Sequence, residues 1–483
     1  MTLPDAAHLR ALIARLEAGL LERDAAVRLV LLAALAGEHV LLIGPPGTAK
    51  SELARRLHTA FAAAPYFERL LTRFSTPEEL FGPLSLKALE ADRYERLTTG
   101  FLPTAGIAFL DEVFKANSAI LNALLTLLNE RAFDNGRGRE AVPLVSVVGA
   151  SNELPADEAL QAFFDRFLVR VPVAPVSDAA FAALLHLPTP GSALPHAAPL
   201  DEAERSAVAT AASAVSLGQD ALQACAALRT WLAARGWTVS DRRWRQWIGL
   251  MRTAAATEGR PDVDVLDLWL APYVAGADAV QMQAVAEWFA HEVLGAVAHD
   301  FAPLGHAVQA FEQQAELEHS APAPGAAGPD DAAGKLALAR AIGWGEGHPA
   351  DGNADAPGTA AMARLTLAGL EAAQRRHYSP VHVASRLAQV DDLLDHVARH
   401  HQALAAQAAA LDARLAGRLW IATSVSARWQ AAHAGSLARL QSLTTRLQAA
   451  REAFAALPVS QAAPPVAPEP VALPALDSLT PAV

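Results

Sequence analysis

The stretch Gly44-Pro45-Pro46-Gly47-Thr48-Ala49-Lys50-Ser51 decides the fold that the sequence predicts. An apolar run at 39–43 precedes it and is typical of a buried strand, and residues 52–58 after it have helical spacing. A strand, a glycine-containing loop, Lys-Ser and a helix form a phosphate-binding loop, where backbone N–H groups and a helix N-terminus hold polyphosphate. Lys50 is predicted to reach the β- and γ-phosphates, and the Ser51 hydroxyl to ligate Mg²⁺.

One position departs from the usual pattern G-x-x-x-x-G-K-[ST], because Ala49 stands where glycine commonly precedes the lysine. Alanine costs little at this point if its φ is negative, so the prediction of a phosphate-binding loop stands. An ordinary glycine turn before a lysine is the alternative for this motif taken alone.

A second acidic motif closes the run Ile-Ala-Phe-Leu-Asp-Glu at 107–112. We expect a buried parallel strand whose carboxyl end delivers Asp111 and Glu112 beside the phosphate loop, as in nucleoside triphosphatases. Asp111 would hold Mg²⁺, directly or through water, and Glu112 would polarise the attacking water. The alternative for this run by itself is a strand that simply meets solvent.

A third strand, at 144–149, is followed by Asn152. An amide at the tip of a neighbouring strand can orient the lytic water, although an asparagine that caps a turn would give the same pattern. Strands and helices alternate as far as residue 171. This alternation predicts a parallel α/β sheet covered on both faces.

Beyond Pro172 the strand patterns stop, and residues 178–297 read as helices. Ser240 is a good N-cap for one of them, and Arg242 and Arg243 occupy its first turn. The helix dipole disfavours arginine there, so an anionic ligand would explain the placement; solvated arginines would explain it equally well.

The C-terminal third has a different composition. Residues 321–357 read as a linker with a short helix at 333–342, residues 359–457 as long helices in a hairpin or bundle, and residues 458–483 as a disordered Pro/Ala-rich tail. Asp392, His396 and His400 share one helical face at a spacing that could bind a metal. Metal binding is the less favoured interpretation, because nothing obliges a further ligand to converge there.

Bulk composition narrows the function classes. The 483 residues are 52% hydrophobic and 19% charged, with a net charge of −12, which argues against a large nucleic-acid footprint. A single cysteine, Cys225, fits a reducing compartment. The N-terminus lacks the features of a signal peptide, and the most apolar helix, at 25–36, is too short to span a bilayer. We therefore expect a cytoplasmic protein without a membrane span.

Taken together, these motifs resemble those of the AAA+ ATPases, and among them the MoxR family, most closely its RavA-like branch. The resemblance covers about residues 5–300. In that branch alanine also precedes the Walker A lysine. The motifs that carry the resemblance are Gly-Pro-Pro-Gly-Thr-Ala-Lys-Ser (44–51), Thr-Arg-Phe-Ser-Thr-Pro-Glu-Glu-Leu-Phe-Gly-Pro (72–83), Arg-Tyr-Glu-Arg-Leu (93–97), Phe-Leu-Asp-Glu (109–112), Ala-Ser-Asn-Glu-Leu-Pro (150–155), Phe-Asp-Arg-Phe (164–167) and Val-Ser-Asp-Arg-Arg-Trp (239–244).

The resemblance implies a role for each site residue. Asp111 and Glu112 match Walker B, and Asn152 matches sensor 1. Arg166 matches the arginine finger that reaches a neighbouring subunit's γ-phosphate. Arg242 matches sensor 2, with Arg243 as the fallback.

The resemblance also implies an architecture: an α/β P-loop core with a parallel sheet, an all-α lid and an additional helical C-terminal arm. The expected division is 1–175 for the core with a helix-2 insert at about 84–103, 176–300 for the lid, 301–358 for a helix and linker, 359–457 for the arm and 458–483 for the tail. Such proteins form hexameric rings with ATP and Mg²⁺ at subunit interfaces. They act as chaperone-like remodellers, often beside a partner with a von Willebrand factor A domain. RavA also carries a β-rich module that docks a lysine decarboxylase; no strand pattern for it is seen here, which makes that partner doubtful.

The sequence leaves two other function classes open. A DNA-processing AAA+ ring would need a basic DNA-binding module, and none is visible in the sequence. A scaffold whose nucleotide site controls assembly without hydrolysis would not need every catalytic position to be filled. A GTPase is disfavoured because no Asn-Lys-x-Asp element follows the core.

Overall fold

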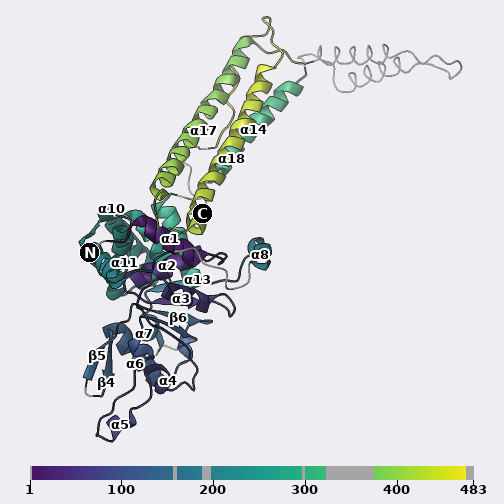
Figure 1. Ribbon diagram of the computed structural model, residues 1–483. Coiled ribbons are helices and arrows are strands. Elements are labelled where there is room, and N and C mark those ends of the chain that lie inside the picture. The colour runs from purple at the N-terminus through teal and green to yellow at the C-terminus, as the bar shows by residue number, and fades with distance from the viewer. Residues whose placement is uncertain are drawn as a thin grey trace, which may run out of the picture. The chain divides into compact units, whose positions relative to one another are not determined.

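The computed structural model describes residues 3–136, 138–155, 160–187, 197–295, 300–322 and 375–474 (Figure 1). The chain forms two compact units, which are described separately. Unit 1 consists of Met1–Ala296 and Ala410–Gln430, and unit 2 of Val297–Ala409 and Ala431–Val483.

Unit 1 is built on a five-stranded parallel sheet in the order β2-β3-β6-β1-β7. Successive residues of a strand point to opposite faces, so Val40 and Leu42 join one hydrophobic cluster while Leu41 joins the other. Both faces are therefore buried, and the predicted parallel α/β core is confirmed. The strands are β1 (Val40–Ile43), β2 (Tyr66–Leu70), β3 (Ile107–Asp111), β6 (Ser146–Ser151) and β7 (Val169–Pro172).

Helices supply the rest of both clusters. The cluster that contains Val40 takes its helical side chains from the N-terminal helices and from the helical elements after β7, and the cluster that contains Leu41 takes them mainly from α6. The helices are α1 (Ala6–Glu17), α2 (Asp24–Leu35), α3 (Lys50–His58) and α6 (Ser118–Glu130). α2 is apolar almost all round because it is buried between the sheet and other helices.

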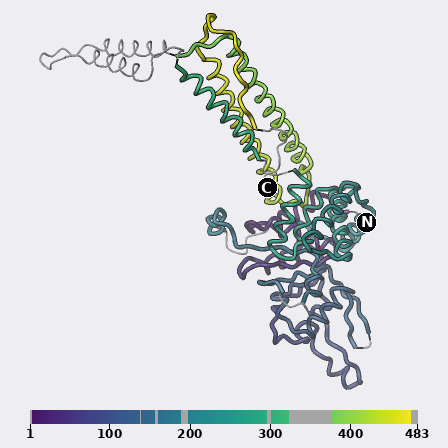
Figure 2. Tube along the Cα trace, turned by 180° about the vertical axis from the view of Figure 1, so that it is seen from behind, coloured from purple at the N-terminus to yellow at the C-terminus, as the bar shows by residue number. Residues whose placement is uncertain are grey.

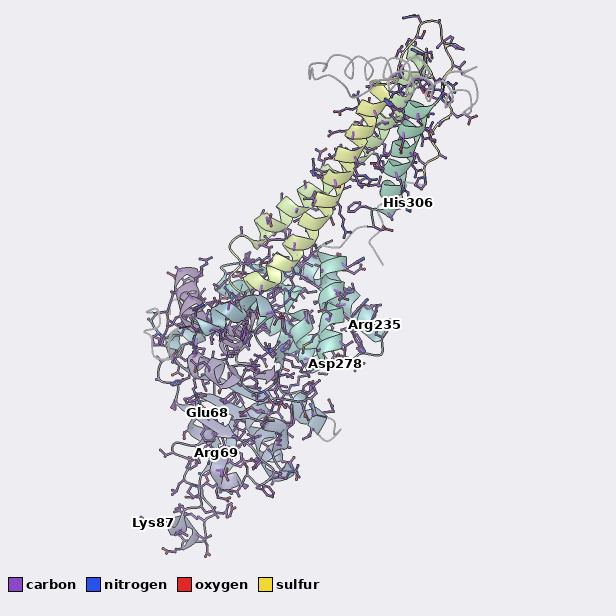
Figure 3. The ribbon with its side chains drawn as sticks, turned by 90° about the vertical axis from the view of Figure 1, so that its right-hand side faces the viewer. Glu68, Arg69, Lys87, Arg235, Asp278 and His306 are labelled. Carbon is purple, nitrogen blue, oxygen red and sulfur yellow. The ribbon has the colours of Figure 1, made fainter. Side chains whose placement is uncertain are left out.

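The predicted helix-2 insert lies at one end of unit 1 beside an antiparallel hairpin of two short strands, as both views show (Figures 1 and 2). The backbone N–H of Arg96 in the insert donates to Asn135 Oδ1 of the hairpin at 2.7 Å. Lys87 marks the far end of the insert (Figure 3). The elements here are α4 (Pro77–Phe81), α5 (Leu86–Leu89), β4 (Ala132–Asn135) and β5 (Gly138–Ala141).

The part of unit 1 after β7 is mostly helical, but the expectation that strands end at Pro172 is wrong. Two short strands, β8 (Ser216–Leu217) and β9 (Asp262–Val263), pair in parallel. Two residues are too few to show any period in a sequence. The helical elements are α8 (Asp178–Leu185), α9 (Glu202–Ala214), α10 (Gln219–Ala233), α11 (Asp241–Thr257), the 3₁₀ segment η4 (Val265–Leu270), α12 (Ala271–Ala275), α13 (Ala279–Trp288) and the π-helical turn η5 (Phe289–Val293).

Unit 2 is a bundle around one apolar cluster that three helices share: α14 (Ala302–Ser320), α17 (Pro380–Leu415) and α18 (Thr423–Ala455). Helix α14 comes from the segment expected to be a helix and linker, and the predicted short helix at 333–342 lies outside the described residues. Residues 458–474, expected to be disordered, include a turn at 461–463 and are hydrogen-bonded to the bundle: Tyr378 N donates to Pro458 O at 2.8 Å, and Val471 N to Gln389 Oε1 at 3.4 Å. Within the described ranges, every helix falls short of the length or the hydropathy that crossing a bilayer requires.

Candidate active site

The phosphate-binding loop connects the carboxyl end of β1 to the start of α3. Gly44 is required because a Cβ there would lie 2.1 Å from the Val173 carbonyl oxygen on the neighbouring strand segment. Gly47 has φ +79°, a conformation that favours glycine. The Thr48 hydroxyl donates to Pro45 O at 2.9 Å and closes the turn.

Ala49 adopts the left-handed conformation, with φ 67° and ψ 25°. The expectation that alanine would be tolerated through a negative φ is therefore wrong. A non-glycine residue in this region costs on the order of 1 kcal/mol or more, and such strain concentrates at functional sites. The loop keeps this strained residue immediately before Lys50.

Lys50 is only 7% exposed, and its ammonium donates inside the site. The acceptors are Gly44 O at 2.6 Å, Pro45 O at 2.9 Å and Asn152 Oδ1 at 3.0 Å. Burial lowers the pKa of Lys50, while the charges of Asp111 and Glu112 act in the opposite direction. The two motifs predicted from separate stretches of sequence therefore share one electrostatic environment.

Asn152 links the basic and acidic halves of this site. It follows β6, which lies between β1 and β3 in the sheet, so the topology places its side chain between the two motifs. Its Oδ1 accepts from Lys50, and its Nδ2 donates to Glu112 Oε1. Lys115 pairs with the other oxygen, Glu112 Oε2, at 3.3 Å, so both oxygens of that carboxylate are held.

The donor set at this edge fits a magnesium ion. Asp111 stands at the end of β3, and its Oδ1 accepts from Glu112 N at 3.0 Å; Ser51 is the second residue of α3. Among the described residues, no group of three or more histidine, cysteine or acidic side chains could hold a metal by itself. One carboxylate, one hydroxyl and phosphate oxygens are what Mg²⁺ commonly uses in nucleotide sites.

The three arginines predicted for the site lie near the amino ends of the strands, at the opposite end of the sheet from the phosphate loop. Helix α11 begins near the amino ends of β1 and β7: Gln246 donates to Glu38 just before β1, and Arg243 to Leu168 O just before β7. Arg166 also precedes β7 directly. The phosphate loop follows the carboxyl end of β1, so the structure does not bring these arginines to Lys50 of their own subunit.

Arg242 and Arg243 differ sharply in their surroundings. The Arg243 side chain is buried, and its guanidinium donates to Asp165 O, Phe167 O, Leu168 O and Val274 O at 2.6–3.1 Å. These contacts tie α11 and α12 to the sheet, so Arg243 is structural. Arg242 is exposed and donates to Asn129 Oδ1 at 3.0 Å.

Arg166 is half-buried, and its Nε has no hydrogen-bond partner among the described residues. It follows α7 (Gln161–Phe164) at the end of the Phe-Asp-Arg motif. Its position is fixed by the flanking Phe164 and Phe167, which are both buried.

Sequence reasoning missed Arg23, whose guanidinium donates a hydrogen bond to the backbone of the phosphate loop. Arg23 is 6% exposed, and it donates to Thr48 O of the loop at 3.3 Å and to Ala174 O after β7 at 2.6 Å. It occupies the N-cap position of α2, where arginine is not a usual cap. An arginine in place of a usual N-cap residue, directly before an apolar helix, is the feature of the sequence that could have indicated a role for Arg23.

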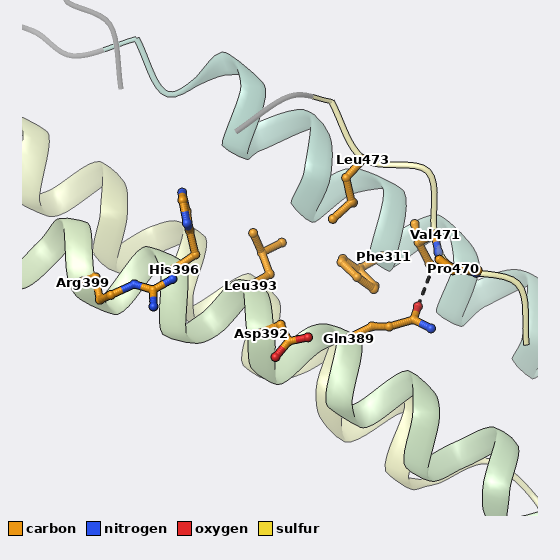
Figure 4. Close-up of a pocket in the computed structure, with 9 residues that line it drawn as sticks. All are labelled: Phe311, Gln389, Asp392, Leu393, His396, Arg399, Pro470, Val471 and Leu473. Atoms are coloured by element: carbon orange, nitrogen blue, oxygen red, sulfur yellow. Dashed lines mark hydrogen bonds between the residues drawn. The ribbon is translucent and has the colours of Figure 1, made fainter. Parts of the chain in front are cut away.

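The possible metal site in unit 2 does not assemble. His396 Nε2 and His400 Nε2 lie 3.0 Å apart, but Asp392 does not join them, and Figure 4 shows its carboxylate pointing away from the His396 ring. Asp392 and His396 instead line a largely apolar cavity of about 250 Å³ that Phe311 and Val471 also border. We therefore place no metal there.

Residues 7–201 match the family model described as the MoxR domain in the MoxR-vWA-beta-propeller ternary systems, and residues 220–289 match the model of an AAA lid domain.

Curated relatives match over a shorter stretch. Two uncharacterised proteins of Methanocaldococcus jannaschii are 57% identical over 151 residues, which is 31% of this chain and 40% of each relative. A structural protein of Acidianus two-tailed virus is 32% identical over 150 residues, 29% of this chain and 24% of that protein. The chain therefore spans less than half the length of the curated relatives it matches.

Among solved structures, a protein of Cytophaga hutchinsonii described as a candidate ATPase is similar with a TM-score of 0.49 at 14% identity. The similarity covers 60% of this chain and 94% of that one.

Proposed function

We propose that this chain is a Mg²⁺-dependent ATPase that works as a hexameric ring and remodels a protein partner. The matches at 7–201 and 220–289 support a MoxR-family AAA+ ATPase, with an α/β core, a helical lid and additional C-terminal helices. One observation carries the proposal of hydrolysis: Asn152 joins the ammonium of Lys50 to the carboxylate of Glu112 at the edge that bears the phosphate loop.

Each residue at this edge has a distinct chemical task. Loop N–H groups and Lys50 neutralise the β- and γ-phosphates of ATP. Ser51 and Asp111 would hold Mg²⁺, which would add positive charge where the leaving ADP develops negative charge. Glu112 orients the attacking water and accepts its proton, and Asn152 holds the Glu112 carboxylate in position for that task.

The arginines argue for a site shared between subunits. Arg166 and the exposed Arg242 lie at the amino edge of the sheet, opposite the phosphate loop. A neighbouring subunit that presents its amino edge to this loop would supply both guanidinium groups at once. An arginine finger contributes about 10³–10⁵ in rate in related phosphoryl transfer. A closed ring gives every subunit one donor edge and one acceptor edge.

The proposed partners are a von Willebrand factor A domain protein and a β-propeller protein, the components named in the description of the matching family model. The insert has a surface suited to protein contact, because several of its large apolar side chains are exposed. These are Leu86 at 75%, Leu89 at 50%, Tyr94 at 58% and Leu97 at 56%. We propose that the insert contacts the remodelled protein. A RavA-like client, including lysine decarboxylase, has no support in the described residues.

Turnover by the purified full chain tests the proposal. We expect Mg²⁺-dependent phosphate release, lost in Lys50→Ala together with ATP binding. In Glu112→Gln release should be lost while bound ATP persists, since the phosphate cradle is intact. Glu90→Gln, an exposed acid in the insert, is the matched control and should keep the wild-type rate.

Two outcomes would overturn this assignment. Unchanged turnover in Glu112→Gln would remove Glu112 as the base. Turnover that depends on duplex DNA and falls steeply with salt would favour a DNA-processing motor instead.

A further inference from the structure

The turn between α17 and α18 is part of unit 1, although most of both helices belongs to unit 2. Residues 416–424, called the arm tip below, carry a strongly apolar centre. Leu419 is 4% exposed and Trp420 0%, and both belong to the cluster that contains the side chains of α1, α2 and α11. The arm tip is therefore inserted in the core of the nucleotide-binding unit.

One side of the arm tip holds the lid. The Arg418 guanidinium pairs with Glu258 at 3.2 Å and also with Asp264. The backbone N–H of Leu419 donates to Glu258 Oε1 at 2.7 Å. The Trp420 indole N–H donates to Thr257 Oγ1 at 2.8 Å at the end of α11.

The other side holds the first two turns of α2. Ser424 donates twice to the Asp24 carboxylate, from its backbone N–H at 2.9 Å and from its hydroxyl at 2.8 Å. Arg28, one turn further along α2, donates from Nε to Leu419 O at 3.2 Å. An acid from α2 thereby caps the N-terminus of α18, where a negative charge is favourable.

The residue next to Asp24 supports the phosphate loop. Arg23 donates to Thr48 O, and it is bonded directly to Asp24 in the chain. Because Arg23 is the N-cap and Asp24 the first residue of α2, any displacement of this end of the helix moves the contact on the arm tip and the contact on the loop together. Arg23 is thus a positioning residue for the loop.

We propose that the arm tip is a coupling element that clamps the lid to the first turn of α2 and, through Arg23, sets the position of the phosphate loop. The proposal rests on the proposed function, because it names a regulation of the same nucleotide site. Release of the arm tip from these contacts lowers nucleotide affinity, and nucleotide binding stabilises the docked tip by the same factor, since coupling between two sites is reciprocal.

The test uses the full chain with four single substitutions around the arm tip, their double variant at positions 24 and 424, and two substitutions of Arg23. Asp24→Asn and Ser424→Ala weaken the contact with α2, Trp420→Ala removes the buried anchor, and Ser426→Ala is the matched control. The Ser426 hydroxyl donates within its own helix, to Thr423 O. Circular dichroism establishes that each variant is folded, and Asp24→Asn and Ser424→Ala keep the test valid if Trp420→Ala fails to fold.

Two readouts separate the inference from the proposed function. Hydrogen exchange of residues 44–51 without nucleotide should become about threefold to tenfold faster in Asp24→Asn and Ser424→Ala, and no faster in Ser426→Ala. Affinity for a fluorescent ATP analogue should fall by about fivefold, at the low end of measured couplings between sites. The double variant should lose less affinity than the sum of the two single variants, because both substitutions act on the contact between the Ser424 hydroxyl and the Asp24 carboxylate.

The outcomes are distinct. Unchanged exchange and unchanged affinity in both contact variants would overturn the coupling. A wild-type chain that binds no nucleotide, but whose loop exchange still responds to Asp24→Asn and Ser424→Ala, would overturn the proposed function and leave the coupling intact. Arg23→Lys should bind ATP more tightly than Arg23→Met, because lysine keeps the positive charge beside the loop. If the substitutions acted only through a general loss of stability, the two variants would bind ATP equally weakly.

Discussion

The ammonium of Lys50 lies 3.0 Å from the side-chain oxygen of Asn152, whose amide nitrogen donates to Glu112. The asparagine that follows one strand therefore connects residues that follow two other strands. This arrangement gives Asn152 a second proposed task, since it holds the carboxylate of the proposed base besides orienting the attacking water.

Replacing Asn152 separates positioning from binding. We expect Asn152→Ala to reduce the rate of ATP hydrolysis by about 100-fold, the effect typical of removing one pre-organised polar group. ATP affinity should change by less than about threefold, because the loop and Lys50 still hold the phosphates. Single-turnover kinetics with separate binding titrations measure both quantities. Asn122→Ala, at an exposed position of α6, should have no effect; a purely weaker Kd in Asn152→Ala would contradict the role.

Ala49→Gly tests the strain in the phosphate loop. Since φ at this residue is 67°, glycine should relieve it and stabilise the protein by up to about 1 kcal/mol. Ala209→Gly, in the exposed interior of α9, should destabilise by about 0.5–1 kcal/mol, as glycine does in a helix. Thermal unfolding of the two variants side by side gives the comparison. Destabilisation by both would mean that Ala49 is not strained.

Mixing two inactive variants tests the shared site. A ring of Arg166→Ala and Lys50→Ala subunits contains some interfaces where an intact loop faces an intact finger, so activity should return. Equal random mixing should restore about a quarter of the wild-type rate, because half of the loops are intact and half of those meet an intact finger.

A mixture of Lys50→Ala and Glu112→Gln is the control for this experiment. Both changes affect the loop side of the interface, so no complete site can form and the mixture should stay inactive. Activity retained by Arg166→Ala alone would show that no finger is needed.

The adjacent arginines should respond oppositely to substitution. Arg243→Met should destabilise the protein by about 3 kcal/mol, since four carbonyl groups, most of them buried, lose this donor and Asp165 loses its ion pair with Arg243. Arg242→Ala should change stability by less than about 0.5 kcal/mol, as exposed substitutions usually do, but should reduce hydrolysis in the assembled ring. Melting curves and ATPase rates for both variants decide the matter. A stable Arg243→Met protein would be incompatible with the structural role.

His39 should make the core sensitive to acid. Its Nδ1 accepts from Val147 N at 3.1 Å and its Nε2 faces Leu128 O at 3.2 Å, so the neutral ring satisfies both partners. Burial lowers its pKa to about 4, and the charge of Arg131 acts in the same direction. The unfolded chain therefore takes up a proton that the folded chain refuses, and stability should fall as the pH drops from about 6.5 to about 4, by up to about 1.4 kcal/mol per pH unit.

The measurement is the unfolding midpoint between pH 4 and pH 8 for the wild type and His39→Gln. Glutamine keeps a donor and an acceptor but does not titrate, so its curve should be flatter across this window. Parallel curves for the two proteins would exclude His39 as the source.

Local patterns were enough to predict the core of this protein. Each motif of the site consists of a few consecutive residues: the run at 39–51, the acids after 107–110 and the asparagine after 144–149. A strand followed by a loop or an acid is formed by neighbours in the chain, so its sequence carries the information directly. The parallel sheet and the helical segments after it followed from the same periodicities.

What only the tertiary structure decided depends on residues far apart in the chain. Neither the different burial of Arg242 and Arg243, nor the positions of Lys50 and Arg166 at opposite ends of the strands, is encoded near those residues; both follow from strand order and from how α11 packs. The left-handed conformation of Ala49 and the docking of Trp420 in the core belong to the same class. Local sequence sets which element a segment forms, whereas burial, strain and partners are set by whatever the fold brings against it.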